Sequence, residues 1–255
     1  MAHEWPHEHP RGRMHQHARR RGGGGRRGRE RQLSREAILD AALAIVDREG
    51  VDAVTMRRVA EELGTGAASL YAHVQDKDEL LHAAYDRMMG QEIPPAVTPD
   101  PKRWQEQTKE LMRAYRRALL KHNDIAKLQL GNVPTGPNAV RAMEQMFAVL
   151  HAGGLPPRDI GYAGDLLAQF MTVSAYEVAL FNARMRSPED WEDFHRELVD
   201  FFANLPAAEF PTLKLLAPSL VEEDEDEDTR FEFGLDILVR GLAAHAPATR
   251  RRPVR

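Results

Sequence analysis

The chain has 255 residues and a formal net charge of −4, and its 42% hydrophobic content is enough to bury a core in one large domain or two smaller ones. It contains no cysteine, which excludes disulfides, thiolate metal sites and a cysteine nucleophile. No apolar run approaches the roughly 20 residues of a membrane span, and the amino terminus is too polar for a secretion signal, so we expect a cytoplasmic protein with no membrane partner.

Residues 1–32 have the composition of a disordered basic tail. The first 31 residues hold nine arginines against three glutamates, together with five of the eleven histidines and a glycine run from Gly22 to Gly25. Almost nothing in this stretch is apolar, so we expect disorder. Two roles stay open for its basic part: contact with a nucleic-acid backbone, or simple solubilisation of the chain.

Residues 33–92 predict a small helical domain. A first helix is expected from Ser34 through Glu49, with Gly50 as its stop and one apolar face made by Ile38, Leu39, Ala42, Ile45 and Val46. Two short helices at a tight turn follow. Thr55 is placed to cap the first of them with its hydroxyl. The glycines on either side of Thr65 permit the turn.

The second short helix, from about Ala67 to Val74, has small residues at its front and polar residues behind. This shape fits a helix that enters the major groove of DNA. Tyr71 and His73 can donate to phosphate, and Lys77 adds a charge in the first turn of a connecting helix that Asp76 caps. That helix is expected to run to Met89. Arg57 is a further candidate for a phosphate or base contact.

The stretch from Val54 to Leu81 resembles the TetR family of bacterial repressors. The family signature is T-x-R-x-[VL]-A-x-x-L-G-x-x-x-x-[ST]-L-Y-x-H-[VF]-x-x-K-x-x-L-L, and this sequence meets every fixed position of it. The resemblance implies that a set of residues faces DNA, namely Thr55, Arg57, Thr65, Ala67, Ala68, Ser69, Tyr71, His73 and Lys77. It also implies a double-stranded operator DNA as partner.

A proline-rich run from Ile93 to Pro101 predicts a domain boundary, and residues 102–246 predict a second helical domain. Helices are expected at 104–121, 123–130, 138–151, 157–184, 187–205 and 228–244. No stretch shows sustained period-two alternation, so the predicted fold class is all-α. The acidic run Glu222 to Asp228 is expected to form a solvated loop, and residues 247–255 a basic tail.

Two of these helices are apolar around much of their circumference, one from Gly161 to Arg184 and one from Phe231 to Leu242. They need more cover than one small domain provides. The TetR family pairs the corresponding helices with those of a second subunit in a four-helix bundle, and a two-fold dimer suits a palindromic operator. We therefore expect a homodimer, while an internal core position for both helices remains the alternative.

The second domain resembles the tetracycline repressors within this family, most clearly in the terminal F-x-F-G-L-x-I-L-x-x-G-L motif that begins at Phe231. In those repressors an imidazole ligates the magnesium that tetracycline carries, and Gln129 stands at its position. A neutral amide is a poor metal ligand, so a magnesium-chelated ligand is not expected and we predict no cofactor or metal. The predicted effector pocket is largely apolar and comprises Ile93, Leu111, Tyr115, Gln129, Val133, Pro134, Met146, Gln169 and Met171.

These patterns together predict a transcriptional repressor that binds a palindromic operator and leaves it when a small, largely apolar effector enters the second domain. The effector could be aromatic or polyketide-like. The alternative is a constitutive or architectural DNA-binding protein whose second domain only dimerises. An enzyme is not expected, because the sequence offers no Ser, His and Asp constellation, no phosphate loop and no metal triad.

Overall fold

The computed structural model describes residues 33–133, 135–221 and 228–246. The two predicted tails, Pro134 and residues 222–227 of the acidic run lie outside the described residues. Within those ranges the chain is helical and has no strand, which confirms the predicted all-α class. The described residues belong to one compact unit.

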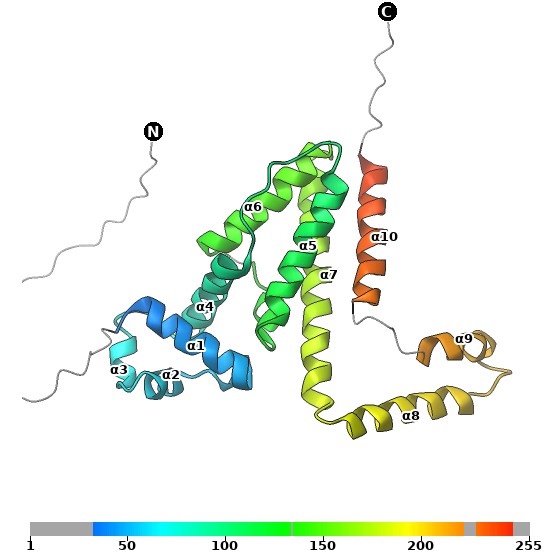
Figure 1. Ribbon diagram of the computed structural model, residues 1–255, viewed down its shortest axis with the longest axis horizontal. Helices are drawn as coiled ribbons and strands as arrows, with labels where there is room; N and C mark the ends of the chain where they lie inside the picture. Colours follow the sequence, from blue (N-terminus) through cyan, green and yellow to red (C-terminus); the bar gives the residue numbers. More distant parts are fainter. Residues whose placement is uncertain (1–32, 134, 222–227, 247–255) are drawn as a thin grey trace, which may run out of the picture. The chain divides into compact units, whose positions relative to one another are not determined.

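The first part of this unit contains four α-helices and a short 3-10 turn (Figure 1), with bounds α1 (Arg35–Glu49), η1 (Val51–Ala53), α2 (Met56–Glu62), α3 (Ala67–Leu70) and α4 (Lys77–Glu92). The caps predicted at Thr55 and Asp76 are present, and Ser34, expected only to start its helix, supplies a third. The Ser34 hydroxyl accepts from Ala37 N at 3.2 Å, and the Thr55 hydroxyl accepts from Arg58 N at 3.2 Å. Asp76 Oδ1 accepts from Glu79 N at 2.8 Å. Each side chain satisfies an N–H that the helix itself leaves free.

The helix α3 is shorter than the sequence predicted, because it ends at Leu70 instead of continuing to about Val74. The backbone N–H groups of His73 and Val74 both donate to the carbonyl of Leu70, at 2.9 and 3.1 Å. This tight turn carries Val74 into the core, where it is 1% exposed, and brings Asp76 to the start of α4.

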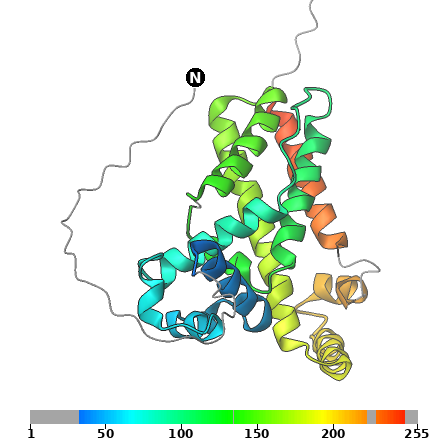
Figure 2. The same ribbon diagram turned by 60° about the vertical axis from the view of Figure 1, so that its left-hand side comes forward.

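The second part contains α5 (Trp104–Leu120), η2 (Ile125–Gln129), α6 (Pro137–Ala152), α7 (Pro157–Arg184), α8 (Pro188–Asn204), α9 (Pro211–Val221) and α10 (Thr229–His245). Its core lies where α5 packs against α6, α7 and α10 (Figures 1 and 2). The helix α4 packs against both α1 and α6, so it links the two parts of the unit.

Helices α8 and α9 differ from the rest because none of their residues is buried. They pack against each other, and both views show α8 running away from the end of α7 (Figures 1 and 2). The sequence analysis did not predict α9, which contains an internal proline, Pro218.

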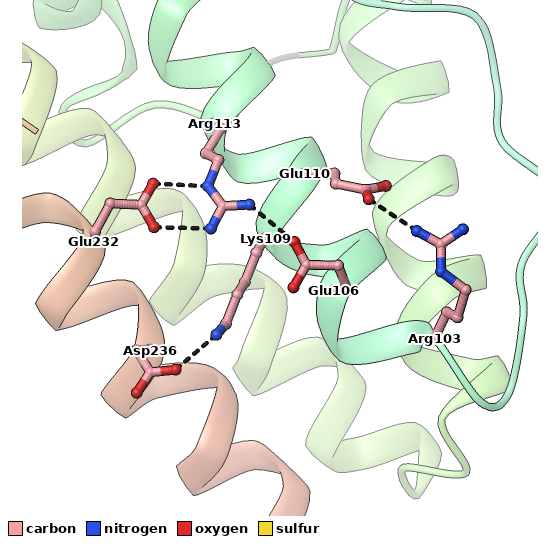
Figure 3. Close-up of polar contacts among 7 residues, drawn as sticks. All are labelled: Arg103, Glu106, Lys109, Glu110, Arg113, Glu232 and Asp236. Carbon is pink, nitrogen blue, oxygen red and sulfur yellow. Dashed lines mark hydrogen bonds and ion pairs between the residues drawn. The ribbon is translucent and has the colours of Figure 1, made fainter.

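A row of ion pairs joins α5 to α10 (Figure 3). Arg113 donates from two nitrogens to the two carboxylate oxygens of Glu232, at 2.7 and 2.8 Å, and Lys109 Nζ lies 2.6 Å from Asp236. Arg116 follows on α5. Its guanidinium pairs with Asp228 and lies 4.6 Å from the centre of the Phe231 ring. Because these positions are three or four residues apart on each helix, the row fixes the register of α10 against α5.

Candidate nucleic-acid interface and effector site

The turn between α2 and α3 gives the first candidate site its shape. Gly64 has a φ of 65°, in the left-handed region that glycine tolerates, and Thr65 N donates to the carbonyl of Ala60 at 2.9 Å. Leu70 is fully buried below the turn. Leu70 belongs to the hydrophobic core, α3 packs against α2, and the other face of α3 is left toward solvent.

That outer face carries the residues predicted to contact DNA. Ala68, Ser69 and Tyr71 are exposed, and Tyr71 has 56% of its surface accessible. Thr65, Ala67, His73 and Lys77 are half-buried around them. The structure therefore gathers these residues on α3, its flanking turns and the first turn of α4. Such a surface combines small residues that admit a close backbone approach with donors for phosphate.

Two further predicted residues lie at the start of α2. Thr55 caps α2, as described above. The Arg57 side chain is 85% exposed and donates from Nε to Glu61 at 2.9 Å. A surface pair of this kind contributes between about 0 and 1 kcal/mol, so the guanidinium is readily exchanged onto a phosphate.

The second candidate site centres on Gln129, at the end of η2. Its amide nitrogen donates to the hydroxyl of Tyr85 on α4, and its amide oxygen accepts from the hydroxyl of Thr172 on α7 at 2.5 Å. Both ends of the amide are thus engaged by the protein. Burial raises the pKa of the Tyr85 hydroxyl, with the nearby Asp86 carboxylate as a second cause, so the phenol stays protonated at neutral pH.

The other predicted pocket residues do not all lie together. Leu111, Tyr115, Met146 and Met171 are buried in the core of the second part, and the Tyr115 hydroxyl donates to the carbonyl of Ala142 at 2.9 Å. Ile93 follows the end of α4 and is half-buried, and Val133 is 77% exposed. Gln169 is exposed and donates to Asp165 at 2.7 Å, which places it on the outside of α7.

A cavity of about 860 Å³ lies beside Gln129. One wall comes from α1 and α4, including His82 and Tyr85, and the other from residues of η2, the start of α6 and the described residues between them. Gln129 and Val133 are the two predicted pocket residues that line it. The volume lies within the range of about 300 to 1,000 Å³ typical of small-molecule sites.

The helix α4 runs from the first site to the second, and its far half is fixed by polar contacts. Asp86 Oδ1 accepts from the backbone N–H groups of Asn138 and Ala139 on α6, each at 2.9 Å. A separate junction joins the end of α1 and η1 to the residues around η2, where Val51 N donates to Asp124 at 2.7 Å and Lys127 donates to Asp52 at 2.6 Å. The two parts are therefore coupled at α4 and at η1.

Comparison with known proteins agrees with this geometry. Residues 38–84 match the family described as bacterial regulatory proteins, tetR family, and residues 98–246 match the tetracyclin repressor-like C-terminal domain. An HTH-type transcriptional regulator of Saccharopolyspora erythraea is 32% identical, over 84% of this chain and 86% of that protein.

This chain belongs to the TetR family of bacterial regulatory proteins.

Two further proteins are similar to this TetR-family chain over most of its length. The class D tetracycline repressor of Escherichia coli is 26% identical, over 85% of this chain and 92% of that protein. The crystal structure of the Streptomyces coelicolor TetR family protein ActR in complex with actinorhodin has a TM-score of 0.75 and 42% identity, covering 85% of this chain and 99% of that one. The family assignment from the sequence is therefore confirmed, and the α2-turn-α3 unit is the helix-turn-helix of a DNA-binding regulator.

Some residues of this TetR-family site were missed by the sequence analysis, namely Tyr85, Asp86 and Thr172. Tyr85 falls on the apolar stripe of α4, four residues after Leu81 and three before Met88, so helical spacing identifies it as a buried side chain. Nothing in the sequence shows that it meets an amide 44 residues away.

Exposed apolar side chains form a stripe on one side of α7 at intervals of four or seven residues, and two more are exposed on α10. The members are Tyr162, Leu166, Val173, Leu180, Phe233 and Ile237. The exposed Gln169 falls in register with this stripe.

In the ranges that the structure describes, no helix is long and apolar enough to cross a membrane.

Proposed function

We propose that this TetR-family regulator is a ligand-responsive transcriptional repressor that binds a palindromic operator as a homodimer and is released by a small, largely apolar effector. The observation that carries the proposal is the course of α4. Its first turn holds Lys77 at the helix-turn-helix, and its far half touches η2 and α6 through Tyr85 and Asp86. A ligand beside Gln129 can therefore move the reading head, which is the helix-turn-helix of one subunit. The relatives named above are regulators, and the proposed activity is binding without bond-making chemistry.

The homodimer rests on the exposed stripe of α7 and α10. Phe233 is 70% exposed and Ile237 is 53% exposed, although both belong to a helix whose other side is buried in the core. Large contiguous apolar surfaces on soluble proteins mark interaction sites. A second copy brought against the stripe by a two-fold axis covers it, and it sets two reading heads about 34 Å apart for two half-sites.

The effector class follows from the donors around Gln129. In the tetracycline repressors an imidazole at this position binds magnesium, whereas here the amide oxygen already accepts from Thr172 at 2.5 Å. This arrangement does not fit a metal chelate. The apolar residues predicted for the pocket, among them Leu111 and Met146, lie in the core, whereas more than half of the residues that line the cavity are polar or charged, such as Arg35 and Glu79. ActR, 42% identical, was solved with actinorhodin. A flat aromatic or polyketide-like molecule that also carries polar groups, without an obligatory metal, matches this lining.

Release requires the effector to bind better to the conformation in which the reading heads no longer match the operator. A hundredfold drop in operator affinity needs about 2.7 kcal/mol of coupling free energy. The contacts of α4 with η2 and α6 are the route for this coupling, because they join the cavity wall to the DNA-binding face.

A constitutive DNA-binding protein is the second candidate, and one observation favours it. Leu111, Tyr115, Met146 and Met171 pack as ordinary core residues, each no more than 6% exposed. On this alternative the second part of the chain serves dimerisation alone, and no compound changes operator affinity.

Footprinting on DNA from the region upstream of its own gene tests the DNA-binding part of the proposal. We expect protection of two symmetric half-sites about 10 base pairs apart, centre to centre. Protection of a single half-site, or uniform protection that disappears with modest salt, would contradict a dimer on a palindrome.

A further inference from the structure

The amino terminus of α6 lacks a capping group of its own. Gly136 occupies the N-cap position and has no side chain, and Pro137 at the next position has no N–H to donate. The first free N–H groups of the helix are those of Asn138 and Ala139. Both donate to the same oxygen of Asp86, each at 2.9 Å. The cap of α6 is therefore supplied by α4, 52 residues earlier in the chain.

The Asn138 side chain completes the junction from the other direction. Its Nδ2 atom lies 3.0 Å from Asp86 Oδ2 and 3.0 Å from the carbonyl oxygen of Asp86. The carboxylate also sits at the positive end of the α6 dipole, where a negative charge is favoured. Four hydrogen bonds, three to its carboxylate and one to its backbone carbonyl, thus fix Asp86 of α4 to the first turn of α6.

Two glycines allow the helices to approach this closely. A Cβ atom added at Gly136 would lie 2.2 Å from Asp86 Oδ1, and one added at Gly90 would lie 2.6 Å from Asn138 Nδ2. Either side chain would force the junction apart. The close approach of α4 to α6 therefore requires glycine at positions 90 and 136. It allows Asp86 to contact the α6 backbone directly.

We infer that Asp86 is a positioning residue for operator binding: by capping α6 from α4, it sets the direction of α4 and hence the distance between the two reading heads of the dimer. This inference rests on the function proposed above. Asp86 lies nine residues beyond Lys77, which corresponds to about 13 Å along the helix axis. A pivot at Asp86 therefore shifts the helix-turn-helix at the other end of α4.

A cap that only stabilised its own helix would change affinity for every operator alike. A cap that orients α4 has a different signature, because loosening it relaxes the preference for one half-site spacing. The readout that separates the two roles is thus the ratio of affinities across operators of different spacing, together with the unfolding transition.

The experiment uses the full-length protein, its footprinted operator, and versions lengthened or shortened by one or two base pairs at the centre. Asp86→Ala removes the cap, and Asp86→Asn retains an acceptor oxygen without the charge. Glu144→Gln is the control for a lost carboxylate on α6, since Glu144 is exposed on that helix. We expect Asp86→Ala to reduce the preference for the native spacing by about tenfold, with a smaller reduction for Asp86→Asn and none for Glu144→Gln.

An Asp86→Ala protein that remains a folded dimer and keeps the wild-type spacing preference would overturn the inference, as would an equal effect of Glu144→Gln. If Asp86→Ala does not fold, Asp86→Asn decides between the same outcomes. Failure of the proposed function is a separate result: the wild-type protein then shows no spacing preference on any palindrome.

Discussion

The side-chain oxygen of Gln129 accepts a hydrogen bond of 2.5 Å from the hydroxyl of Thr172, while its nitrogen donates to the hydroxyl of Tyr85. One amide therefore holds η2 between α4 and α7. An amide with both ends engaged is oriented and rigid, and breaking either contact leaves a polar group without a partner. Gln129, where the resemblance to tetracycline repressors implies a metal-binding imidazole, here links three elements of the fold.

Gln129→Ala should destabilise the protein, because it leaves the Tyr85 and Thr172 hydroxyls without this partner. We expect a loss of about 1 to 3 kcal/mol in the free energy of unfolding, measured by denaturant titration. Gln105→Ala is the matched control. Gln105 is exposed in the first turn of α5, so its removal should cost less than about 0.5 kcal/mol. Equal losses in the two variants would contradict the linking role.

Tyr71→Ala and Lys77→Ala should weaken operator binding and leave the dimer intact. Tyr71 is exposed beside α3, and Lys77 begins α4. If Lys77 contacts phosphate, its loss should also reduce the slope of log affinity against log salt by about one. Fluorescence anisotropy at several salt concentrations measures both effects. Lys102→Ala, an exposed lysine before α5, serves as the control. If both Tyr71→Ala and Lys77→Ala bound the operator with wild-type affinity, this face would not be the one that contacts DNA.

Phe233→Asp should convert the protein to a monomer. Phe233 is 70% exposed on α10 and belongs to the stripe assigned to the second copy. Burying an aspartate in an apolar interface costs several kcal/mol unless it is paired. Sedimentation or light scattering at micromolar concentration measures the change. Val133→Asp places the same charge at another highly exposed apolar position and should have no effect. A Phe233→Asp protein of unchanged mass would show that the stripe lies outside the interface.

The ion pair of Arg113 with Glu232 predicts that part of the folding stability contributed by α10 is lost in acid. The hydrogen bond from Arg113 is the main cause that lowers the pKa of Glu232 below its ordinary value of 4.5, against an opposing contribution from desolvation. A lowered pKa in the folded state means that the pair stabilises the protein above pH 4.5 and loses this contribution as the pH falls through the folded-state pKa.

Glu232→Gln should therefore lower stability at neutral pH and flatten the decline of stability in acid. The loss should be about 0.5 to 1 kcal/mol, since the pair is partly exposed. Urea unfolding between about pH 7 and about pH 3 measures both changes. Glu197→Gln on the exposed face of α8 is the control. A parallel pH profile for Glu232→Gln and the wild type would contradict the contribution of this pair.

Most of the fold could be predicted from the sequence because residues next to the helix ends indicate where the helices begin and stop. Ser34, Thr55 and Asp76 lie just before helices α1, α2 and α4 and accept from their first-turn N–H groups, as their residue types indicate. The helix α9 was missed because Pro218 stands inside it, where proline ordinarily breaks a helix. The shorter α3 depends on how Val74 packs, which is a tertiary effect.

The candidate sites divide in the same way. The DNA-facing residues lie within one continuous stretch of sequence, so a local motif could identify them. The surroundings of Gln129 bring together α4, η2 and α7, and the contact of Asp86 with Asn138 spans 52 residues. Such long-range contacts depend on how the helices pack, and no pattern in a single sequence predicts them. The need of Gln129 for partners was predictable, whereas their identity was not.

The most direct test of the account is a fluorescence-anisotropy titration of the purified protein on its operator, repeated with a panel of flat aromatic and polyketide-like compounds that includes actinorhodin, with and without magnesium. The account predicts that at least one compound releases the protein, about a hundredfold in operator affinity, and that magnesium makes no difference. Specific binding that every compound leaves unchanged, or release that requires magnesium, would contradict it.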